Sequence, residues 1–167
     1  MRESQPNGGR ETCDIVLIAG NRLDCPRLPV GLGFIAQAVE DAGFTYAVCD
    51  VALQSEHYIL RKIKSLRPRF VGLSTMSLKV YQNYELIRHI KAECDTMVIL
   101  GGPHVIADKE HIFSDCPDID IAVQGEGEMA IVEILRGTPW RDVHNAVFPK
   151  ADSSLHVNPI TYLDINA

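Results

Sequence analysis

Five short runs of apolar, strand-forming residues alternate along this chain with segments of helical periodicity. Nearly continuous apolar runs are typical of strands that are covered on both faces of a parallel sheet. Helical segments between successive parallel strands make right-handed crossovers. The pattern therefore predicts a doubly wound α/β fold of the flavodoxin-like or Rossmann-like class, with a parallel five-stranded sheet flanked by helices.

The predicted order of the strands in this sheet is 2-1-3-4-5. The apolar runs predict strands at residues 14–19, 45–49, 70–74, 97–100 and 119–123. The helical periods predict helices at residues 31–42, 58–66, 81–93, 109–113 and 128–135.

Two of the predicted strands end in glycine-rich loops. The fourth strand runs into Gly101, Gly102 and Pro103, and the fifth runs into the segment Gln124–Glu128, which contains two further glycines. Glycine lets the backbone approach a ligand closely, and proline stops the strand from continuing. In open parallel sheets, ligands bind outside the carboxyl ends of the strands, where the strand order reverses. The sequence therefore predicts a binding crevice between these two loops.

The carboxyl-terminal part of the chain has a different pattern. Apolar runs at residues 146–148 and 155–157 flank the turn-forming segment 149–154, which predicts a β-hairpin. The extended, apolar piece that follows is typical of a linker to something longer. We expect a flexible tail over residues 1–12, one domain over residues 13–140, and a hairpin and linker over residues 141–167.

The composition excludes several classes of function. The formal net charge is -6 and no basic run offsets it, so we expect no binding to nucleic acid or to an anionic membrane surface. No stretch reaches the roughly 18 apolar residues of a membrane span, and no signal peptide is recognisable, so we expect a cytoplasmic protein. The five cysteines are widely and irregularly spaced, which indicates reduced thiols and no metal site made by this chain.

Residues 31–36 match the dinucleotide-binding fingerprint, and Asp50 lies where an acidic ribose ligand would be expected. The fingerprint requires its first glycine to end the first strand, whereas a loop with two prolines separates that strand from Gly31. We therefore prefer a plain helix start at this position. The sequence also lacks the acidic residues of a phosphoacceptor domain, the hydroxyl-rich loop of a flavodoxin, a nucleophile elbow and a P-loop.

Four segments, taken in order and with their spacing, resemble the cobalamin-binding domain at the amino end of many radical SAM enzymes. They are Leu28–Ala36, Val71–Thr75, Leu100–His104 and Gln124–Glu128, and the resemblance covers residues 14–136. It implies a cobalamin-binding module for methyl transfer or another radical reaction. S-adenosylmethionine and a four-iron four-sulfur cluster would belong to a C-terminal radical SAM domain, whose C-x-x-x-C-x-x-C motif this chain lacks. By itself the chain is not expected to be catalytic.

The resemblance also implies a set of cofactor-binding residues. Ser74 and Thr75 would hydrogen-bond the buried nucleotide tail or its phosphate, Gly101 and Gly102 would line the slot for the tail, and the segment Gly125–Gly127 would meet the ribose end. The whole implied set is Asn21, Arg22, Ser74, Thr75, Met76, Gly101, Gly102, Pro103, Gly125, Glu126 and Gly127.

Simpler structural roles remain open for several of these residues. Ser74 or Thr75 can cap the following helix. The Gly101–Pro103 segment can be no more than a strand stop. Glu126 and Glu128 can complement the positive end of a helix.

Methionine synthases and carbon-skeleton mutases carry a D-x-H-x-x-G motif after the first strand, whose histidine binds cobalt, and this chain lacks that motif. The resemblance therefore implies base-off cobalamin without a histidine ligand from the first loop, which offers Asn21, Arg22 and Asp24. His104 is the nearest alternative ligand, but we interpret it as a polar surface residue on a loop.

Two other functions stay open. A cofactor-free, flavodoxin-like interaction domain would have its crevice filled by side chains such as Met76 or Leu23. A nicotinamide-dependent oxidoreductase domain would use Gly31 and Gly33.

Overall fold

The computed structural model describes residues 12–20 and 30–162. Nearly all of the predicted tail lies outside these ranges. So do the predicted first-loop residues Asn21 and Arg22, together with Leu23 and Asp24.

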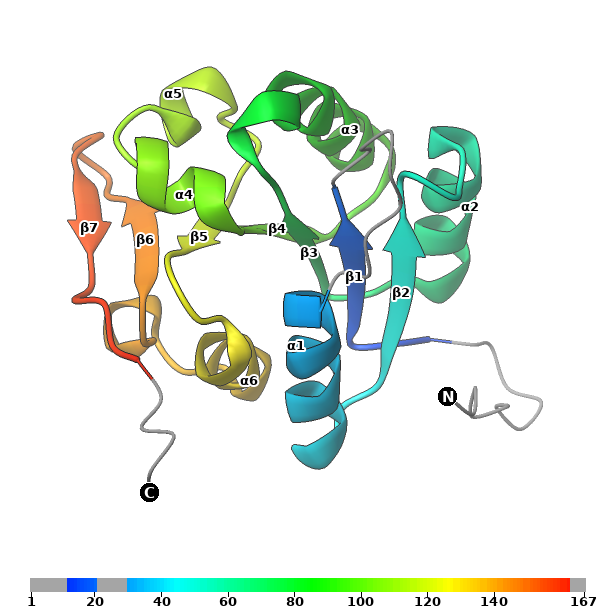
Figure 1. Ribbon diagram of the computed structural model, residues 1–167, viewed down its shortest axis with the longest axis horizontal. Helices are drawn as coiled ribbons and strands as arrows, with labels where there is room; N and C mark the ends of the chain where they lie inside the picture. Colours follow the sequence, from blue (N-terminus) through cyan, green and yellow to red (C-terminus); the bar gives the residue numbers. More distant parts are fainter. Residues whose placement is uncertain (1–11, 21–29, 163–167) are drawn as a thin grey trace.

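The described residues form a seven-stranded sheet in the order β2-β1-β3-β4-β5-β6-β7 (Figure 1). Its first five strands are parallel, which confirms the predicted fold class and the predicted order 2-1-3-4-5. They are β1 (Ile15–Ala19), β2 (Tyr46–Asp50), β3 (Phe70–Ser74), β4 (Met97–Gly101) and β5 (Ile121–Val123). The central strands are buried on both faces, as their continuous apolar sequences predict.

Helices cover both faces of the sheet, and each face has its own apolar core. One face is packed against α1 (Val30–Asp41) and α6 (Glu128–Arg136), which lie side by side (Figure 1). The other is packed against four helices: α2 (Glu56–Leu66), α3 (Val80–Glu93), α4 (Pro103–Asp108) and α5 (Ile112–Asp115). Short 3-10 helices occupy Ser77–Lys79 and Trp140–Asp142.

Local sequence signals fix several helix ends. Ser55 caps α2, because its side-chain oxygen accepts a hydrogen bond from the backbone N–H of Tyr58. Gly137 ends α6 in the left-handed conformation, with φ 82°.

The segment after β4 differs from the prediction. We expected a loop followed by a helix at residues 109–113, but α4 begins at Pro103 and α5 follows at Ile112. Proline is favoured in the first turn of a helix because its missing N–H has no intrahelical partner there. The proline that stops β4 therefore also starts α4.

The predicted hairpin is present and belongs to the sheet. Its strands β6 (Ala146–Pro149) and β7 (Leu155–Val157) are antiparallel, and β6 pairs antiparallel with β5. The predicted count of five strands therefore holds for the parallel part only. The additional pairing satisfies backbone groups of β5 that would otherwise form an open sheet edge.

Within the described ranges, the helices are too short or too polar to cross a membrane.

Candidate functional site

A pocket lies between the carboxyl half of the parallel strands and the two helices α1 and α6. Its volume is about 60 Å³, enough for several water molecules. Five glycines line it: Gly72, Gly101, Gly102, Gly125 and Gly127. The rest of its wall is mainly aliphatic and comes from Leu17, Leu32, Ile35, Leu73, Ile99, Val123 and Ile131, together with Ser74. We call this pocket the slot.

The register of the sheet explains why the slot is open. Leu17, Gly72 and Ile99 are register partners on β1, β3 and β4, so a glycine stands between two large side chains. In the next row, Ser74 is the partner of Gly101. A β-carbon built on Gly101 would meet no atom within 4 Å. Small residues on adjacent strands therefore leave one face of the sheet bare over the slot.

Gly102 is required by the backbone itself. Its φ is 95°, and a β-carbon there would lie 2.5 Å from the carbonyl oxygen of Thr75. The first turn of α4 also depends on this close contact between Gly102 and Thr75, because the backbone N–H of His104 donates to the same carbonyl oxygen at 3.3 Å. Gly102 thus brings the β4–α4 connection against the end of β3.

The structure separates the two predicted hydroxyl residues. Ser74 lines the slot, and in the described part of the chain no hydrogen bond engages its hydroxyl. Thr75 is fully buried and does not line the slot. Its hydroxyl accepts from Asn83 Nδ2 and donates to the carbonyl oxygen of Met76. Ser74 is therefore the hydroxyl that can reach a ligand in the slot.

Neither hydroxyl caps a helix. The 3-10 helix after β3 is capped by Met76 and α3 by Lys79, both without a side-chain cap bond. The alternative role of Ser74 or Thr75 as a helix cap is thus wrong.

The loop after β5 contributes Gly125 and Gly127 to the slot, whereas Glu126 does not line it. Gly125 has φ 73°, and a β-carbon on Gly127 would lie 3.1 Å from Ile35 of α1. Glu128 is the first residue of α6, where a negative charge is favoured by the helix dipole. One of its carboxylate oxygens is buried and has no hydrogen-bond partner among the described residues.

Met76 and Pro103 also lie outside the slot lining. Met76 is 40% exposed, so it does not fill the crevice as the cofactor-free interpretation predicts. Leu23, the other side chain of that interpretation, is outside the described residues. Gly31 and Gly33 lie within α1 with no atom within 4 Å of a built β-carbon, so no close backbone approach requires a glycine at either position.

The interpretation of His104 as a surface loop residue is wrong. It lies on α4 and is only 5% exposed. Its Nε2 lies 3.1 Å from the Tyr84 hydroxyl, and its Nδ1 lies 3.0 Å from Ser77 Oγ. Burial raises the pKa of Tyr84, so its hydroxyl stays protonated at neutral pH. His104 therefore joins α4 to α3 and to the turn after β3.

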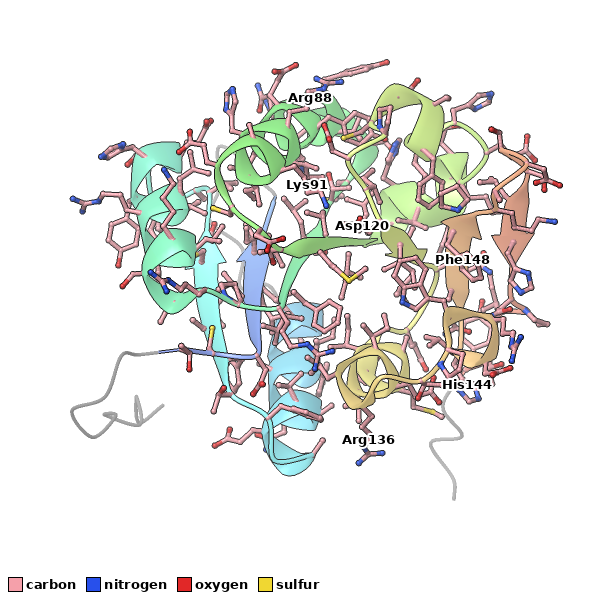
Figure 2. All side chains as sticks on the ribbon, turned by 180° about the vertical axis from the view of Figure 1, so that it is seen from behind. Arg88, Lys91, Asp120, Arg136, His144 and Phe148 are labelled. Carbon is pink, nitrogen blue, oxygen red and sulfur yellow. The ribbon has the colours of Figure 1, made fainter. Side chains whose placement is uncertain are left out.

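The partly buried ion pair between Lys91 and Asp120 (Figure 2) lies at the amino ends of β4 and β5, whereas the slot lies toward the carboxyl ends of the strands. Lys91 Nζ is 2.9 Å from Asp120 Oδ2, and that oxygen also accepts from the backbone N–H of Val98, near the start of β4, at 2.6 Å. Because these contacts are at the amino ends of the strands, the pair has a structural role.

The described residues contain no cluster of three or more His, Cys, Asp or Glu side chains that could hold a metal ion. The four described cysteines are free thiols. Burial raises the pKa of Cys13 and that of Cys116 to about 11, so neither thiol is a reactive nucleophile at neutral pH.

The aliphatic wall of the slot was not predicted from the sequence. Three of its strand residues, Leu17, Ile99 and Val123, lie on the face that is packed against α1 and α6, and a fourth, Leu73, belongs to the core on the other face. Strand alternation assigns the first three to the same face as Gly72 and Gly101, so the glycines could have indicated them. The contributions of Ile35 and Ile131 depend on how the two helices pack, which the sequence alone does not give.

Comparison with known proteins shows the family to which this chain belongs. The family model of the B12 binding domain matches residues 21–135, which is more than half of the chain. The chain belongs to the B12 binding domain family. The slot described above is therefore part of a B12 binding domain.

A curated relative and two solved structures are similar to this B12 binding domain. An uncharacterized methyltransferase of Pyrococcus horikoshii is 29% identical over 109 residues, which cover 64% of this chain and 24% of the relative. The radical S-adenosylmethionine methyltransferase TsrM of Kitasatospora setae, solved with cobalamin and a [4Fe-4S] cluster, has a TM-score of 0.78 and 19% identity over 92% of this chain and 30% of its own.

The cobalamin-dependent S-adenosylmethionine radical enzyme OxsB, solved with aqua-cobalamin and S-adenosylmethionine, has a TM-score of 0.80 and 14% identity. It is covered over 23% of its length, and this chain over 92%. At these identities the two structures show a shared fold. The chain spans about a quarter of the length of the curated relative.

Proposed function

We propose that this chain is the cobalamin-binding module of a larger radical SAM enzyme. The observation that carries the proposal is the slot, a glycine-walled, aliphatic pocket at the carboxyl ends of the parallel strands in a B12 binding domain. In this proposal the flat nucleotide base of cobalamin enters the slot and the corrin ring lies over the strand ends.

The residues present are suited to such a base. Gly101 offers a surface without side chains, and Leu17 and Ile99 offer apolar contacts for an aromatic ring. Ser74 supplies a hydroxyl for a polar atom of the tail. The hydroxyl of Thr75 already has two protein partners, so we assign it to holding the β3 end rather than to the ligand.

When bound, the corrinoid would supply a cobalt centre that can carry a methyl group or take part in a radical reaction. The protein would bind and orient it. The aliphatic side chains would exclude water from the tail, and the left-handed turn at Gly125 would bring the loop before α6 close to it.

We infer that the tail is displaced from cobalt and that no histidine of the first loop replaces it. His104 has both ring nitrogens in hydrogen-bond contact with protein side chains, which supports a structural role for it instead. Asn21 and Arg22, which lie outside the described residues, remain proposed contacts of the corrin face, together with Met76, Pro103 and Glu126.

S-adenosylmethionine and a four-iron four-sulfur cluster would bind to a separate radical SAM domain that follows residues 141–167. Methyl transfer is the reaction we favour, because the Pyrococcus relative is named a methyltransferase and TsrM is one. The four free thiols support a cytoplasmic location within this proposal.

The experiment is incubation with hydroxocobalamin, desalting, and an absorption spectrum of the protein fraction. We expect the wild-type chain to retain corrinoid with the spectrum of the base-off form. Ser74→Leu and Gly101→Leu place a side chain in the slot and should lower retention about tenfold or more. Ser65→Leu, a matched change at an exposed position of α2, should not alter it.

A wild-type protein fraction that contains no corrinoid after desalting would refute the proposal. Retention that both slot variants share with the wild type would place the tail elsewhere. Thermal stabilisation by a nicotinamide cofactor, with no stabilisation by hydroxocobalamin, would favour the oxidoreductase alternative.

A further inference from the structure

Asn145, just before β6, joins the loop after β5 to the segment that follows β7. It is 3% exposed and adopts the left-handed conformation, with φ 60°. Its Nδ2 donates to the carbonyl oxygens of Glu126 and Thr161, each at 3.0 Å. Its Oδ1 accepts from the backbone N–H of Thr161 at 2.6 Å. One buried amide therefore holds two segments that are far apart in the sequence.

Gln124 makes a second link between the same two segments. The residue is 2% exposed, and its Nε2 donates to the carbonyl oxygen of Asn158 at 2.7 Å. Its backbone N–H donates to the carbonyl oxygen of Asn145 at 3.0 Å. Asn158 is held in turn, because its Nδ2 donates to the carbonyl oxygens of Trp140 and Val143 at 3.1 and 2.6 Å.

The segment 158–161 packs against the loop 124–127, which lines the slot. A β-carbon on Gly125 would be 3.4 Å from Cγ2 of Ile160, while Gly125 and Gly127 themselves line the slot. The loop 124–127 thus borders the slot and also contacts the segment 158–161. A movement of the loop that accommodates a ligand must be transmitted to its hydrogen-bonded partner.

We propose that Asn145 is a positioning residue that makes the loop 124–127 and the segment 158–161 one unit, so that corrinoid binding and the order of that segment are coupled. This inference rests on the proposed function and deepens it. Coupling is reciprocal. A ligand that favours the loop in its hydrogen-bonded position also favours the segment in its hydrogen-bonded position, and the hydrogen bonds of Asn145 strengthen ligand binding by the same factor.

Asn145→Gly is the variant that isolates the side chain. Glycine accepts the left-handed backbone, so the change removes the amide without introducing strain at φ 60°. Ser153→Gly is the matched control, since Ser153 has φ 65° in the exposed hairpin turn, away from the loop 124–127. Thr161→Pro is a second test, because it removes the N–H that donates to Asn145 from an exposed position.

The dissociation constant for hydroxocobalamin is measured by spectral titration, and amide exchange of Thr161 is measured with and without the corrinoid. In the wild type and in Ser153→Gly, corrinoid should slow exchange of the Thr161 amide. Asn145→Gly should weaken binding about tenfold and abolish this slowing, and Thr161→Pro should weaken binding in the same direction. A residue with only a structural role would not make Thr161 exchange depend on the corrinoid.

Wild-type binding constants in both Asn145→Gly and Thr161→Pro would overturn the inference, as would Thr161 exchange that does not respond to corrinoid in the wild type. Either result leaves the proposed function intact, because the wild type still binds. Wild-type protein that binds no corrinoid refutes the proposed function, and this inference falls with it.

Discussion

The carbonyl oxygen of Thr75 occupies the space that a β-carbon on Gly102 would need, at 2.5 Å from its position. This contact places the turn before α4 against the end of β3, beside the slot. Gly101, the preceding residue, has no atom within 4 Å of a built β-carbon. Two adjacent glycines therefore have different roles, one in backbone packing and one in keeping the slot open.

Gly102→Ala should strongly destabilise the protein. The substitution combines left-handed strain with a clash against backbone atoms that cannot rotate away, and we expect a loss of about 2–4 kcal/mol in the free energy of unfolding. Urea denaturation measures the loss. Gly101→Ala is the matched control and should change the free energy of unfolding by less than about 1 kcal/mol. Equal losses in the two variants would contradict the different roles.

Tyr84→Phe should cost about 1–3 kcal/mol, because it leaves Nε2 of the buried His104 without its hydrogen-bond partner. Tyr81 is a neighbour on the same helix and is 73% exposed, so Tyr81→Phe should have little effect. Thermal or urea unfolding of the two variants tests the contact. A Tyr84→Phe variant as stable as Tyr81→Phe would show that the His104 contact contributes nothing.

Asp120→Ala should destabilise the protein by about 1–3 kcal/mol, since the carboxylate accepts charge-assisted bonds from Lys91 and from the backbone N–H of Val98. Asp95→Ala, at an exposed position after α3, is the control and should be nearly neutral. Corrinoid retention should be unchanged in both variants, because the ion pair is at the amino ends of the strands. Loss of retention in a folded Asp120→Ala variant would contradict its separation from the slot.

Stability should fall at alkaline pH. The pKa of Cys13 and that of Cys116 rise from 9.0 to about 11 on folding, with burial as the main cause. As the pH rises, the unfolded chain then loses these thiol protons before the folded chain does. The stabilisation of the folded state by the two neutral thiols is therefore complete below pH 9 and is lost as the pH rises toward 11. The free energy of unfolding, measured in urea from pH 8 to 10, should decrease with pH. Cys116→Ala should make the decrease shallower, and an unchanged slope would show that the Cys116 thiol is not the source.

The parallel part of the fold was predictable because its signals are local. Continuous apolar runs, helical periods and the glycines after β4 and β5 indicated the elements, their order and the edge at which ligands bind. The same segments carried the resemblance to cobalamin-binding domains, which the family match supports. Gly101 and Gly102 were predicted to line the slot, and they do. Gly125 and Gly127, which were predicted to meet the ribose end of the tail, line the slot as well.

Other features required the tertiary structure. Ser74 and Thr75 are neighbours with similar hydroxyl groups, and only the packing of α3 shows that the Thr75 hydroxyl is bound by Asn83 while Ser74 lines the slot. His104 looks like a loop residue in the sequence, but packing against Tyr84, twenty residues earlier, buries it.

The sequence by itself determined the kind of sheet, the order of its parallel strands and the place where a ligand can bind. The tertiary structure decided which neighbouring residues face the slot, that the hairpin completes the sheet edge at β5, and that Asn145 joins Glu126 to Thr161. The physical reason is the distance along the sequence over which each kind of interaction acts. Hydrophobic periodicity and turn propensity act over a few residues, whereas strand register, helix packing and buried hydrogen bonds join residues that the sequence keeps apart.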